Sequence, residues 1–257
     1  MRLTVLGSGT SFGVPVIGCD CRVCTSSDPR DSRTRTAAVI ENDAGNRILI
    51  DTPPELRLQL VASGIDGVNA VLYTHGHADH VHGIDDLRAV SVKRGSLSLL
   101  GPEWTLKEIE ERFRYIFDPS VRSARGTSKP DLELRPLVPW DEVMIAGMLV
   151  IPVEVDHGGT AVFGYRVGDI GYVTDAKSVS DRAVEVLRGV KVLILNALLD
   201  RPHATHLSID EAIEIVKRID APQAYLTHLT HRFAHEDLER RLPEGISPAY
   251  DGLTIAF

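Results

Sequence analysis

Short apolar runs alternate along the chain with segments of helical periodicity. Runs rich in β-branched and aromatic residues predict eleven strands, at residues 2–7, 37–41, 47–51, 70–74, 97–100, 148–155, 160–167, 171–176, 191–197, 223–228 and 253–257. Apolar residues recurring three and four positions apart predict six helices, at residues 54–64, 79–95, 105–117, 180–189, 208–219 and 235–242. Turn residues within 37–51 and within 160–176 predict two β-hairpins. The pattern therefore predicts an α/β fold of mixed sheets covered by helices.

The order of these elements also predicts the domain organisation. Eleven strands are too many for a small open sheet, so we expect a four-layer αββα sandwich. No Pro- or Ser-rich linker and no repeat of fixed period divides the sequence, which indicates a single domain over residues 1–257. Ser208 lies three residues before Glu211, and this capping box marks a helix start. We expect the segment 118–131 to form a solvated surface loop, and the alternative is a lid or substrate arm.

Composition narrows the classes of partner. Apolar residues make up 43% and charged residues 25% of the 257 residues, which is the balance of an ordinary globular protein. The 36 Asp and Glu exceed the 28 Lys and Arg, and the resulting net charge of -8 repels long nucleic acids. The N-terminal segment lacks the pattern of a signal peptide, and no apolar run approaches the roughly 20 residues that span a bilayer. We therefore expect a cytoplasmic protein without a membrane partner.

The stretch "YTHGHADHVHG", residues 73–83, is the strongest chemical signal in the sequence. Its imidazoles and carboxylate occupy the loop that leaves the predicted strand 70–74, an exposed and rigidly anchored position. Neutral imidazole and carboxylate are good ligands for zinc and other first-row divalent ions. The four candidate ligands exceed the three that one open catalytic metal needs, which points to two metals: His75, His77, Asp79 and His80. His82 falls outside this spacing and is either a helix-surface residue or a support for the ligands.

This H-x-H-x-D-H pattern resembles the signature of the metallo-β-lactamase superfamily. The resemblance implies an αββα sandwich and three further ligands, which the sequence supplies in order as His157, Asp175 and His228. It also implies how the ligands divide between two metals, with His75, His77 and His157 on one, Asp79, His80 and His228 on the other, and Asp175 bridging. Asp51 matches a family aspartate that orients the ligands, so Asp51 and Asp79 are counted with the catalytic residues.

The three cysteines form a second cluster. Cys19, Cys21 and Cys24 lie within six positions, too close and too few for a disulfide framework, which favours a metal site. A closed zinc site needs a fourth ligand, and His231, three residues after His228, is the candidate. Free buried thiols are the alternative. With the motifs "LGSGTSFGVPVIGCDCRVC" and "LTHLTHRF", the cluster resembles the PhnP-like branch of the superfamily, cyclic phosphodiesterases of phosphonate breakdown, from Leu6 to Phe233.

Several other residues carry weaker signals. PhnP-like enzymes have a catalytic histidine just before a helix, and His206 fits that position. It would hydrogen-bond a nonbridging phosphate oxygen or protonate the leaving oxygen, with helix capping or surface exposure as alternatives. His203 and His235 are left without a functional role. The segment 28–38 predicts an exposed edge with salt bridges rather than a phosphate site, through Arg30, Arg33 and Arg35.

Together these features predict a dinuclear hydrolase with one additional structural zinc. Two divalent ions, zinc or manganese or iron, would present a bridging hydroxide as the nucleophile. Their residual positive charge favours a small anionic substrate, and the expected reaction is hydrolysis of a cyclic or strained phosphodiester. The alternatives are thioester or lactone hydrolysis, tRNA 3′-processing, and a noncatalytic zinc-stabilised interaction module. The resemblance is also compatible with a homodimer.

Overall fold

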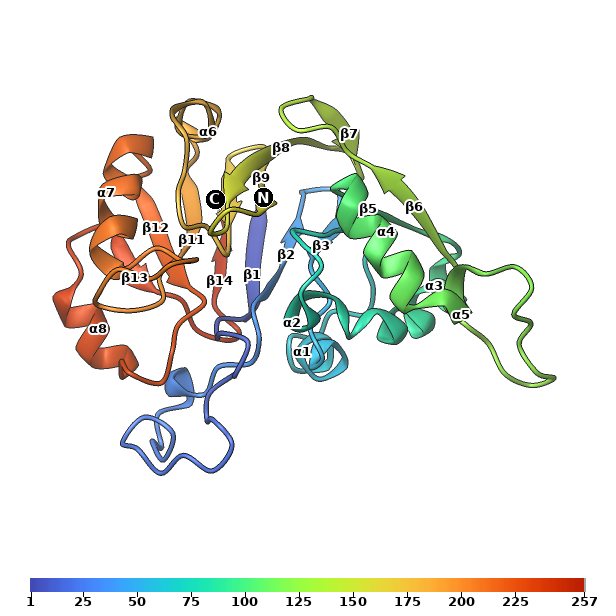
Figure 1. The fold of residues 1–257 in the computed structure, drawn as a ribbon, viewed down its shortest axis with the longest axis horizontal. Coiled ribbons are helices and arrows are strands. Elements are labelled where there is room, and N and C mark those ends of the chain that lie inside the picture. Colours follow the sequence, from blue (N-terminus) through green and yellow to red (C-terminus); the bar gives the residue numbers. More distant parts are fainter. Residues whose placement is uncertain (257) are drawn as a thin grey trace.

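The protein, described over residues 1–256 by a computed structural model, consists of two seven-stranded sheets packed face to face with helices outside each (Figure 1). The first sheet has the order β14-β1-β2-β3-β4-β5-β6. Its strands are β1 (Arg2–Gly7), β2 (Ala37–Glu41), β3 (Arg47–Ile50), β4 (Ala70–Leu72), β5 (Leu97–Gly101), β6 (Leu132–Pro136) and β14 (Thr254–Ala256). β3 to β6 run parallel, whereas β1 is antiparallel to both β2 and β14.

The second sheet has the order β13-β12-β11-β10-β9-β8-β7. Its strands are β7 (Val143–Ile145), β8 (Met148–Asp156), β9 (Ala161–Val167), β10 (Ile170–Val173), β11 (Val192–Asn196), β12 (Gln223–Thr227) and β13 (Ile246–Pro248). β10 to β13 run parallel, and β7 to β10 form antiparallel pairs. Both predicted hairpins are confirmed, as β2–β3 and β9–β10.

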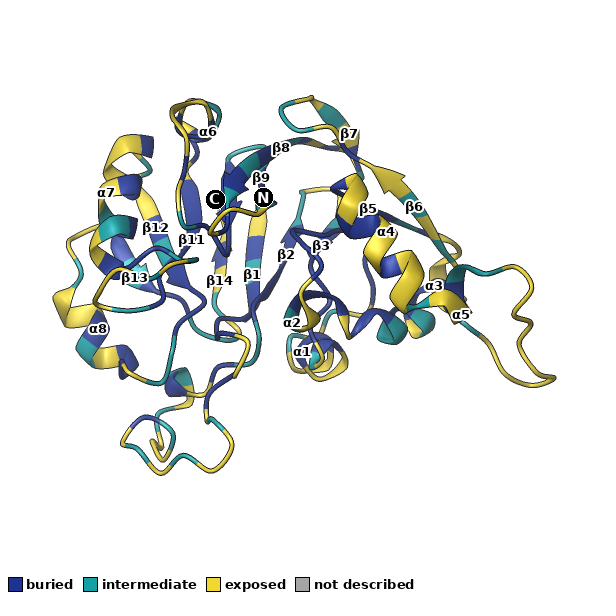
Figure 2. Ribbon diagram, in the orientation of Figure 1, coloured by how far each residue is buried: buried dark blue, intermediate teal, exposed yellow. Residues whose placement is uncertain are grey.

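Three apolar clusters hold the four layers together. The central cluster lies between the sheets and includes Ile40 and Ile48 from the first and Phe163 and Tyr165 from the second. A second cluster packs the first sheet against α1 (Leu56–Ala62), α3 (Leu87–Arg94) and α4 (Glu103–Arg112). The third packs the other sheet against α6 (Asp181–Leu187), α7 (Ile209–Ile219) and α8 (His235–Arg241). The buried strands run between partly exposed helices in Figure 2, so the predicted αββα sandwich is confirmed.

The strands that the sequence did not predict lie at sheet edges. β6, β7 and β13 are each the outermost strand of their sheet. Edge strands are commonly short and polar, or carry proline, so they lack the apolar pattern that identifies central strands. β6 exposes alternate residues, β7 has three residues, and β13 ends at Pro248. The predicted last strand is present as β14, and its final residue, 257, lies outside the described residues.

Two predicted helices are divided. The predicted helix 79–95 is wrong as one element, because the chain forms α2 (Ala78–Val81), a 3-10 turn at Ile84–Asp86 and then α3. The break lies at Gly83, whose N–H donates to the Thr52 carbonyl oxygen at 2.8 Å. A Cβ at this position would lie 2.0 Å from the Pro53 oxygen, so only glycine permits the approach. The predicted helix 105–117 is likewise interrupted at Phe113, between α4 and α5 (Arg114–Phe117).

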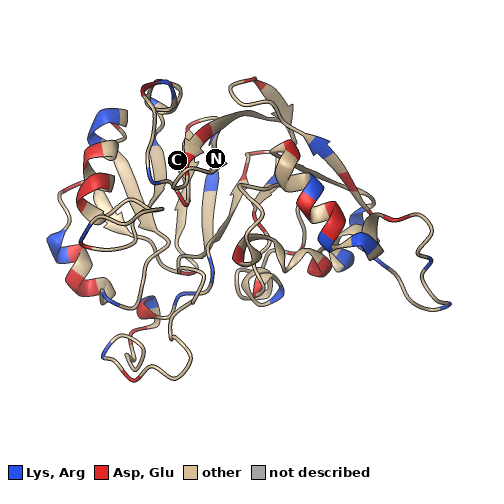
Figure 3. Cartoon of the chain, in the orientation of Figure 1, with Lys and Arg blue, Asp and Glu red and all other residues tan. Residues whose placement is uncertain are grey.

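Other local predictions agree with the structure. The Ser208–Glu211 capping box is present at the start of α7. Residues 119–128 are exposed, in a loop that extends away from the sheets (Figure 1), in agreement with a solvated surface loop. Charged side chains gather on the helices and loops, whereas the strands are largely uncharged (Figure 3). None of the helices within residues 1–256 combines the length and apolar character that crossing a bilayer requires.

Candidate metal centre

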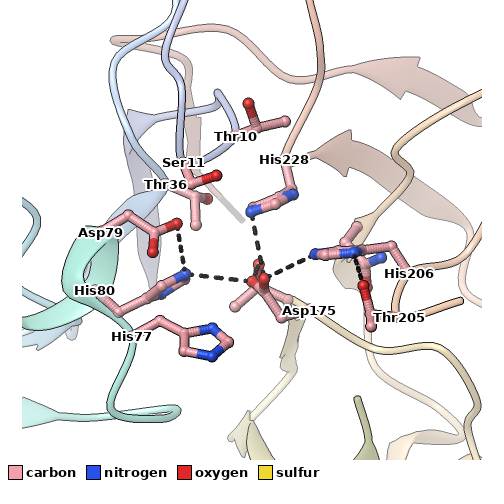
Figure 4. A network of polar contacts seen from close by, with 12 residues as sticks. Thr10, Ser11, Thr36, His77, Asp79, His80, Asp175, Thr205, His206 and His228 are labelled. Carbon is pink, nitrogen blue, oxygen red and sulfur yellow. Dashed lines mark hydrogen bonds and ion pairs between the residues drawn. The ribbon is translucent and has the colours of Figure 1, made fainter. Parts of the chain in front are cut away.

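The predicted metal ligands follow the carboxyl ends of strands from both sheets (Figure 4). The loop after β4 carries the histidine motif of residues 75–80, and β8 is followed at once by His157. Asp175 lies two residues after β10, and His228 follows β12 directly. Because parallel strands end at one edge of a sheet, ligands distant in the sequence are brought to a common site.

The backbone turns sharply at three strand ends near the site, those of β3, β10 and β12. Asp51, Asp175 and His228 have φ angles of 61°, 55° and 59°. The left-handed region is uncommon for residues other than glycine and is often found where function requires it. Asp175 is fixed further by Asn196, whose Oδ1 accepts from the Ala176 N–H at 2.8 Å and whose Nδ2 donates to the Ala176 oxygen at 3.1 Å. The turns therefore direct these side chains into the space between the strand ends.

The seven predicted ligands come together in overlapping groups. In each group one potential ligand atom per residue lies within 4.8 Å of the others. The groups are His75, His77 and His157, then Asp79, His80 and His228, then Asp175 with His75 and His80. Asp175 also joins a group with His157 and His206, so its carboxylate touches both halves of the centre. The first two groups have the same members as the two ligand sets that the sequence resemblance implies, and their assignment to two metal ions stays a prediction.

Buried atoms without partners indicate what the site is built to hold. His228 Nδ1 is buried and has no hydrogen-bond partner, while His228 Nε2 and His80 Nε2 make no hydrogen bond and meet only carboxylate oxygens, at 3.3–3.4 Å. A buried polar atom without a partner is costly, and such atoms are rare in folded proteins. Imidazole and carboxylate donors in this arrangement suit first-row divalent ions. The residues therefore fit the two divalent metal ions that proteins of this fold generally bind.

The carboxylates and imidazoles of the site shift one another's pKa values. Burial alone would raise the pKa of Asp175, but His228 and His80 outweigh it and hold that pKa well below the usual value. Burial would lower the pKa of His80, yet Asp175 and Asp51 keep it well above the usual value. Burial lowers the pKa of His228 to about 4, which leaves a neutral imidazole. Ionised Asp175 and neutral His228 are in the protonation states that metal ligation requires, whereas His80 must release a proton when a metal ion binds.

Asp51 contacts the predicted ligand His80 at the ring nitrogen that faces away from the ligand cluster. Its Oδ2 accepts from His80 Nδ1 at 2.7 Å and from the Thr74 hydroxyl at 2.8 Å, while Oδ1 accepts from the Thr74 N–H at 2.8 Å. The His80 Nδ1 contact leaves Nε2 directed at Asp79 and Asp175, each 3.4 Å away. Asp51, predicted among the catalytic residues, therefore acts in the structure as the carboxylate that orients His80.

Replacing Asp51 with asparagine is expected to weaken metal binding and turnover by roughly 10-fold to 100-fold, the usual cost of losing such a support. The amide keeps the size of the side chain but presents a poorer acceptor to His80. Metal affinity can be measured by competition with a chelating dye. Asp43→Asn, at a position with 93% side-chain exposure on the β2–β3 hairpin, is the matched control. Unchanged metal affinity in Asp51→Asn would contradict the orienting role.

Thr205 connects three histidines of the site. Its carbonyl oxygen accepts from His157 Nδ1 at 2.8 Å, and its hydroxyl lies 2.8 Å from His206 Nδ1 and 3.2 Å from His203 Nδ1. His206 thereby directs Nε2 to Asp175 Oδ1 at 3.0 Å. Thr205 can lie this close to His157 because residue 158 is glycine, where a Cβ would lie 2.7 Å from Thr205 Cγ2. His206 is 12% exposed, and Ser208 rather than His206 caps α7.

We expect Thr205→Val to lower kcat by roughly fivefold to tenfold, because a lost hydrogen bond is worth about 1 kcal/mol. Valine keeps the shape of threonine and leaves the backbone contact to His157 in place. Steady-state kinetics should show restored kcat in Thr205→Ser, which retains the hydroxyl. A Thr205→Val enzyme with the wild-type kcat would show that the hydroxyl does not position His206.

His82, His235 and Arg33 lie outside the metal cluster. His82 is exposed and packs edge-on against Phe113, with ring centroids 5.7 Å apart. His235 is buried, and its backbone N–H donates to Asp31 Oδ1 at 2.7 Å, in agreement with a structural role. The predicted exposed edge is wrong for Arg33, which is fully buried. Its guanidinium instead donates to the carbonyl oxygens of Thr230 at 2.6 Å and Phe233 at 2.9 Å.

The cysteine cluster forms a second candidate metal site. His231 Nδ1 lies 3.3 Å from Cys19 Sγ, 3.5 Å from Cys21 Sγ and 3.4 Å from Cys24 Sγ. Zinc bonds of about 2.3 Å to sulfur and about 2.0 Å to nitrogen, at a tetrahedral angle, would separate the ligand atoms by roughly 3.5 Å. The cysteines form no disulfide, and hydrogen bonding from the Cys24 backbone lowers the pKa of Cys21 to about 6. The four residues therefore fit one zinc ion.

Some residues that shape the site gave no sequence signal. Thr205 contacts His157 and Asn196 contacts Ala176, which are 48 and 20 positions away in the sequence. Asp251 accepts from the backbone N–H groups of Ser8 and Thr34, at 2.9 and 2.7 Å. It thereby joins the loop that follows β1 to the segment that precedes β2. Only the proximity of Thr205 to His203 and His206 could have drawn attention to it.

Comparison with known proteins supports the relationship of this chain to the metallo-β-lactamase superfamily. Residues 46–229 match the family model of the Beta-lactamase superfamily domain. A solved structure of a new diphosphatase from the PhnP family superposes with a TM-score of 0.90 and 42% sequence identity, covering 100% of this chain and 97% of the other. A ribonuclease Z from Pyrobaculum aerophilum is 24% identical over 288 residues, covering 96% of this chain and 93% of that relative.

A further relative is longer than this chain. An octanoyltransferase from Porphyromonas gingivalis is 40% identical over 255 residues, which cover 98% of this chain and 51% of the relative. This chain thus spans about half the length of that protein. The family match, the diphosphatase neighbour and the His and Asp clusters together support a metal-dependent hydrolase. The chain therefore belongs to the metallo-β-lactamase superfamily and, within it, to the PhnP family.

Proposed function

We propose that this hydrolase cleaves a small anionic phosphodiester, cyclic or strained, by attack of water at phosphorus. The observation that carries the proposal is the position of His206. Its Nε2 lies 3.0 Å from Asp175 Oδ1, at the carboxylate that joins the two ligand groups, while Thr205 holds the opposite ring nitrogen. A histidine held in this way can donate a hydrogen bond to a nonbridging phosphate oxygen or a proton to the leaving oxygen.

The chain's own residues supply orientation and local charge. When bound, two divalent ions would lower the pKa of water and stabilise developing negative charge. Asp51 fixes the ring of His80, and the Thr205 carbonyl fixes that of His157, so the ligand atoms are set before substrate arrives. His77 is exposed at the open side of the cluster, where a substrate can approach. A small anion suits this site, whereas the net charge of -8 disfavours long polyanions.

The related PhnP-family structure extends the range of substrates to be tested. That protein is described as a diphosphatase. Hydrolysis of a diphosphate, like that of a phosphodiester, requires attack at phosphorus with charge developing on nonbridging oxygens. The same arrangement of His206 and the two ligand groups would serve both bonds. We therefore include an organic diphosphate among the candidate substrates.

A second candidate is hydrolysis of an acyl thioester or ester. It is favoured by the 40% identity to the Porphyromonas gingivalis octanoyltransferase. Because this chain covers 51% of that relative, the printed name does not by itself assign acyl chemistry to the matching half. Dinuclear sites also hydrolyse carbonyl compounds, so the metal ligands alone do not separate the two reactions.

The decisive experiment compares four substrates with purified protein whose metal content has been measured. These are bis(p-nitrophenyl) phosphate, a nucleoside 2′,3′-cyclic phosphate, an organic diphosphate and an acyl thioester. We expect hydrolysis at phosphorus, loss of activity after chelation and recovery when zinc or manganese is returned. Turnover of the thioester alone would establish the second candidate. A tRNA precursor is assayed separately: its cleavage without turnover of the four small substrates would favour RNA processing, and no turnover of any of the five would favour a noncatalytic module.

A further inference from the structure

A small cavity lies at the cysteine cluster, and its lining includes the segment that links this cluster to His228 of the metal centre. Its volume is about 220 Å³, and its lining residues are Thr10, Phe12, Val16, Thr230, His231 and Arg232. Two of these flank predicted metal ligands in the sequence: Thr230 lies between His228 and His231, and Arg232 follows His231. Thr10 is drawn close to His228 in Figure 4. The much larger cavity of about 720 Å³ lies elsewhere, among residues of β1, β2, β14 and α1.

The two walls of this cavity have matching backbone geometry. Gly9 and Leu229 form a parallel bridge, and the Leu229 N–H donates to the Ser8 oxygen at 2.9 Å. Beyond the bridge, the Thr10 hydroxyl accepts from the Phe12 N–H at 3.3 Å. The Thr230 hydroxyl accepts from the Arg232 N–H at the same distance. Phe12 and Arg232 therefore stand at equivalent positions, each three residues past the bridge.

Buried Arg33 fixes both walls to one support. Its backbone exchanges two hydrogen bonds of 2.8 Å with Val14, on the wall that carries Phe12. Its guanidinium donates to the carbonyl oxygens of Thr230 and Phe233, on either side of Arg232. Because Arg33 is fully buried, these contacts are protected from water and hold the walls at a fixed separation. The cavity is thus shaped by the fold rather than by the chance position of surface side chains.

The side chains at the mouth are chemically unusual for a surface. Phe12 is 73% exposed although it is a large aromatic residue. Arg232 is also exposed and has no ion-pair partner among residues 1–256. An exposed aromatic face suits a planar ring, and a guanidinium suits a phosphate oxygen. A volume of about 220 Å³ is below the roughly 300–1,000 Å³ of pockets for drug-sized ligands, so it suits one ring rather than a whole nucleotide.

We propose that this cavity is a substrate subsite that selects phosphodiesters bearing a planar aromatic ring, such as a nucleobase. The ring stacks on Phe12, and Arg232 pairs with a nonbridging oxygen of the phosphate held at the metal centre. The inference rests on the proposed phosphodiesterase function and adds the class of substrate. No covalent step is assigned to either residue, because both act by binding.

The test compares two substrates that share the scissile ring and differ only in the base. Uridine 2′,3′-cyclic phosphate carries a base, whereas the 2,3-cyclic phosphate of methyl β-riboside does not. Phe12→Ala should raise KM roughly tenfold for the uridine substrate only, since base stacking on an aromatic residue is lost. Arg232→Gln should raise KM for both. Phe12→Tyr should behave as wild type, and Ile17→Ala, at a fully exposed position on the same loop, is the matched control.

A binding measurement keeps the subsite separate from the reaction. Calorimetry with uridine 3′-monophosphate and the metal-loaded protein should show weaker binding in Phe12→Ala, with ribose phosphate unaffected. If wild type hydrolyses neither cyclic phosphate but this binding difference appears, hydrolysis of these cyclic phosphodiesters is refuted while binding of the ring at Phe12 is supported. If wild type hydrolyses both substrates and Phe12→Ala changes neither KM nor binding, the subsite is refuted alone. A monomer–dimer shift on Phe12→Ala would also refute it, because a second copy would then cover Phe12.

Discussion

Replacing Asp175 with asparagine is expected to lower turnover roughly 1,000-fold or more, which corresponds to about 4 kcal/mol of lost transition-state stabilisation. Asp175 is 2% exposed, and its carboxylate lies within 3.4 Å of His80, His206 and His228. Asparagine has nearly the same size but no charge, so the only carboxylate that touches both ligand groups is lost from the described site. Steady-state kinetics and elemental analysis of the same preparation should show low activity together with low metal content.

The comparison requires a variant with the same chemical change away from the centre. Asp200→Asn meets this need, because Asp200 is exposed on the segment that leads to His206. It should keep wild-type kinetics and metal content. Two metal ions per chain with full activity in Asp175→Asn would contradict the bridging position. Full activity in rigorously metal-free protein would contradict the dinuclear centre as a whole.

The sequence predicted different parts of this centre on different grounds. His75, His77, Asp79 and His80 are recognisable by spacing alone, because they share one loop. His157, Asp175 and His228 are single residues at strand ends, and only the family resemblance distinguishes them from other strand-end polar residues. Their convergence depends on how β8, β10 and β12 are ordered in the second sheet. Sheet order is set by long-range pairing, which a local pattern does not encode.

The same distinction explains which parts of the fold were predictable. Central strands and the β2–β3 hairpin follow from apolar runs and turn residues, which are local signals. The edge strands β6, β7 and β13 are short, polar or proline-bearing, so the local signal is weak. The division of the helix after His80 depends on contact between Gly83 and the segment at Thr52–Pro53. The sequence predicts a surface position for Arg33 because the carbonyl groups that bind its guanidinium lie about 200 positions away.

The two candidate metal sites are joined by one short segment. His228 belongs to the dinuclear group and His231 to the cysteine cluster, and Arg33 holds the Thr230 carbonyl between them. The loop of residues 15–27 contributes few apolar contacts of its own. Its small core contains Val14, Val23 and Ala234, with Cys21 and Cys24 packed against it. Metal ligation is therefore the main interaction available to order this loop.

For this reason, Cys21→Ser is expected to destabilise the protein strongly. Loss of a structural metal belongs to the largest class of single-residue effects, roughly 4 kcal/mol or more. In a chain of this size that corresponds to a fall in Tm of roughly 10 °C. Turnover should fall as well, because the segment from His228 to His231 loses its anchor on the cysteine side. Calorimetry and zinc analysis of wild type and variant would measure both changes.

Asp20→Asn is the matched control for this prediction, because Asp20 lies between Cys19 and Cys21 but is exposed. It should retain zinc content, Tm and activity. If Cys21→Ser lost one zinc but kept the wild-type Tm, the loop would be held by its apolar contacts instead. If Tm fell while turnover per folded molecule stayed constant, the cysteine cluster would stabilise the fold without fixing His228. A fall in both quantities would show that the zinc on the Cys side helps to place a catalytic ligand.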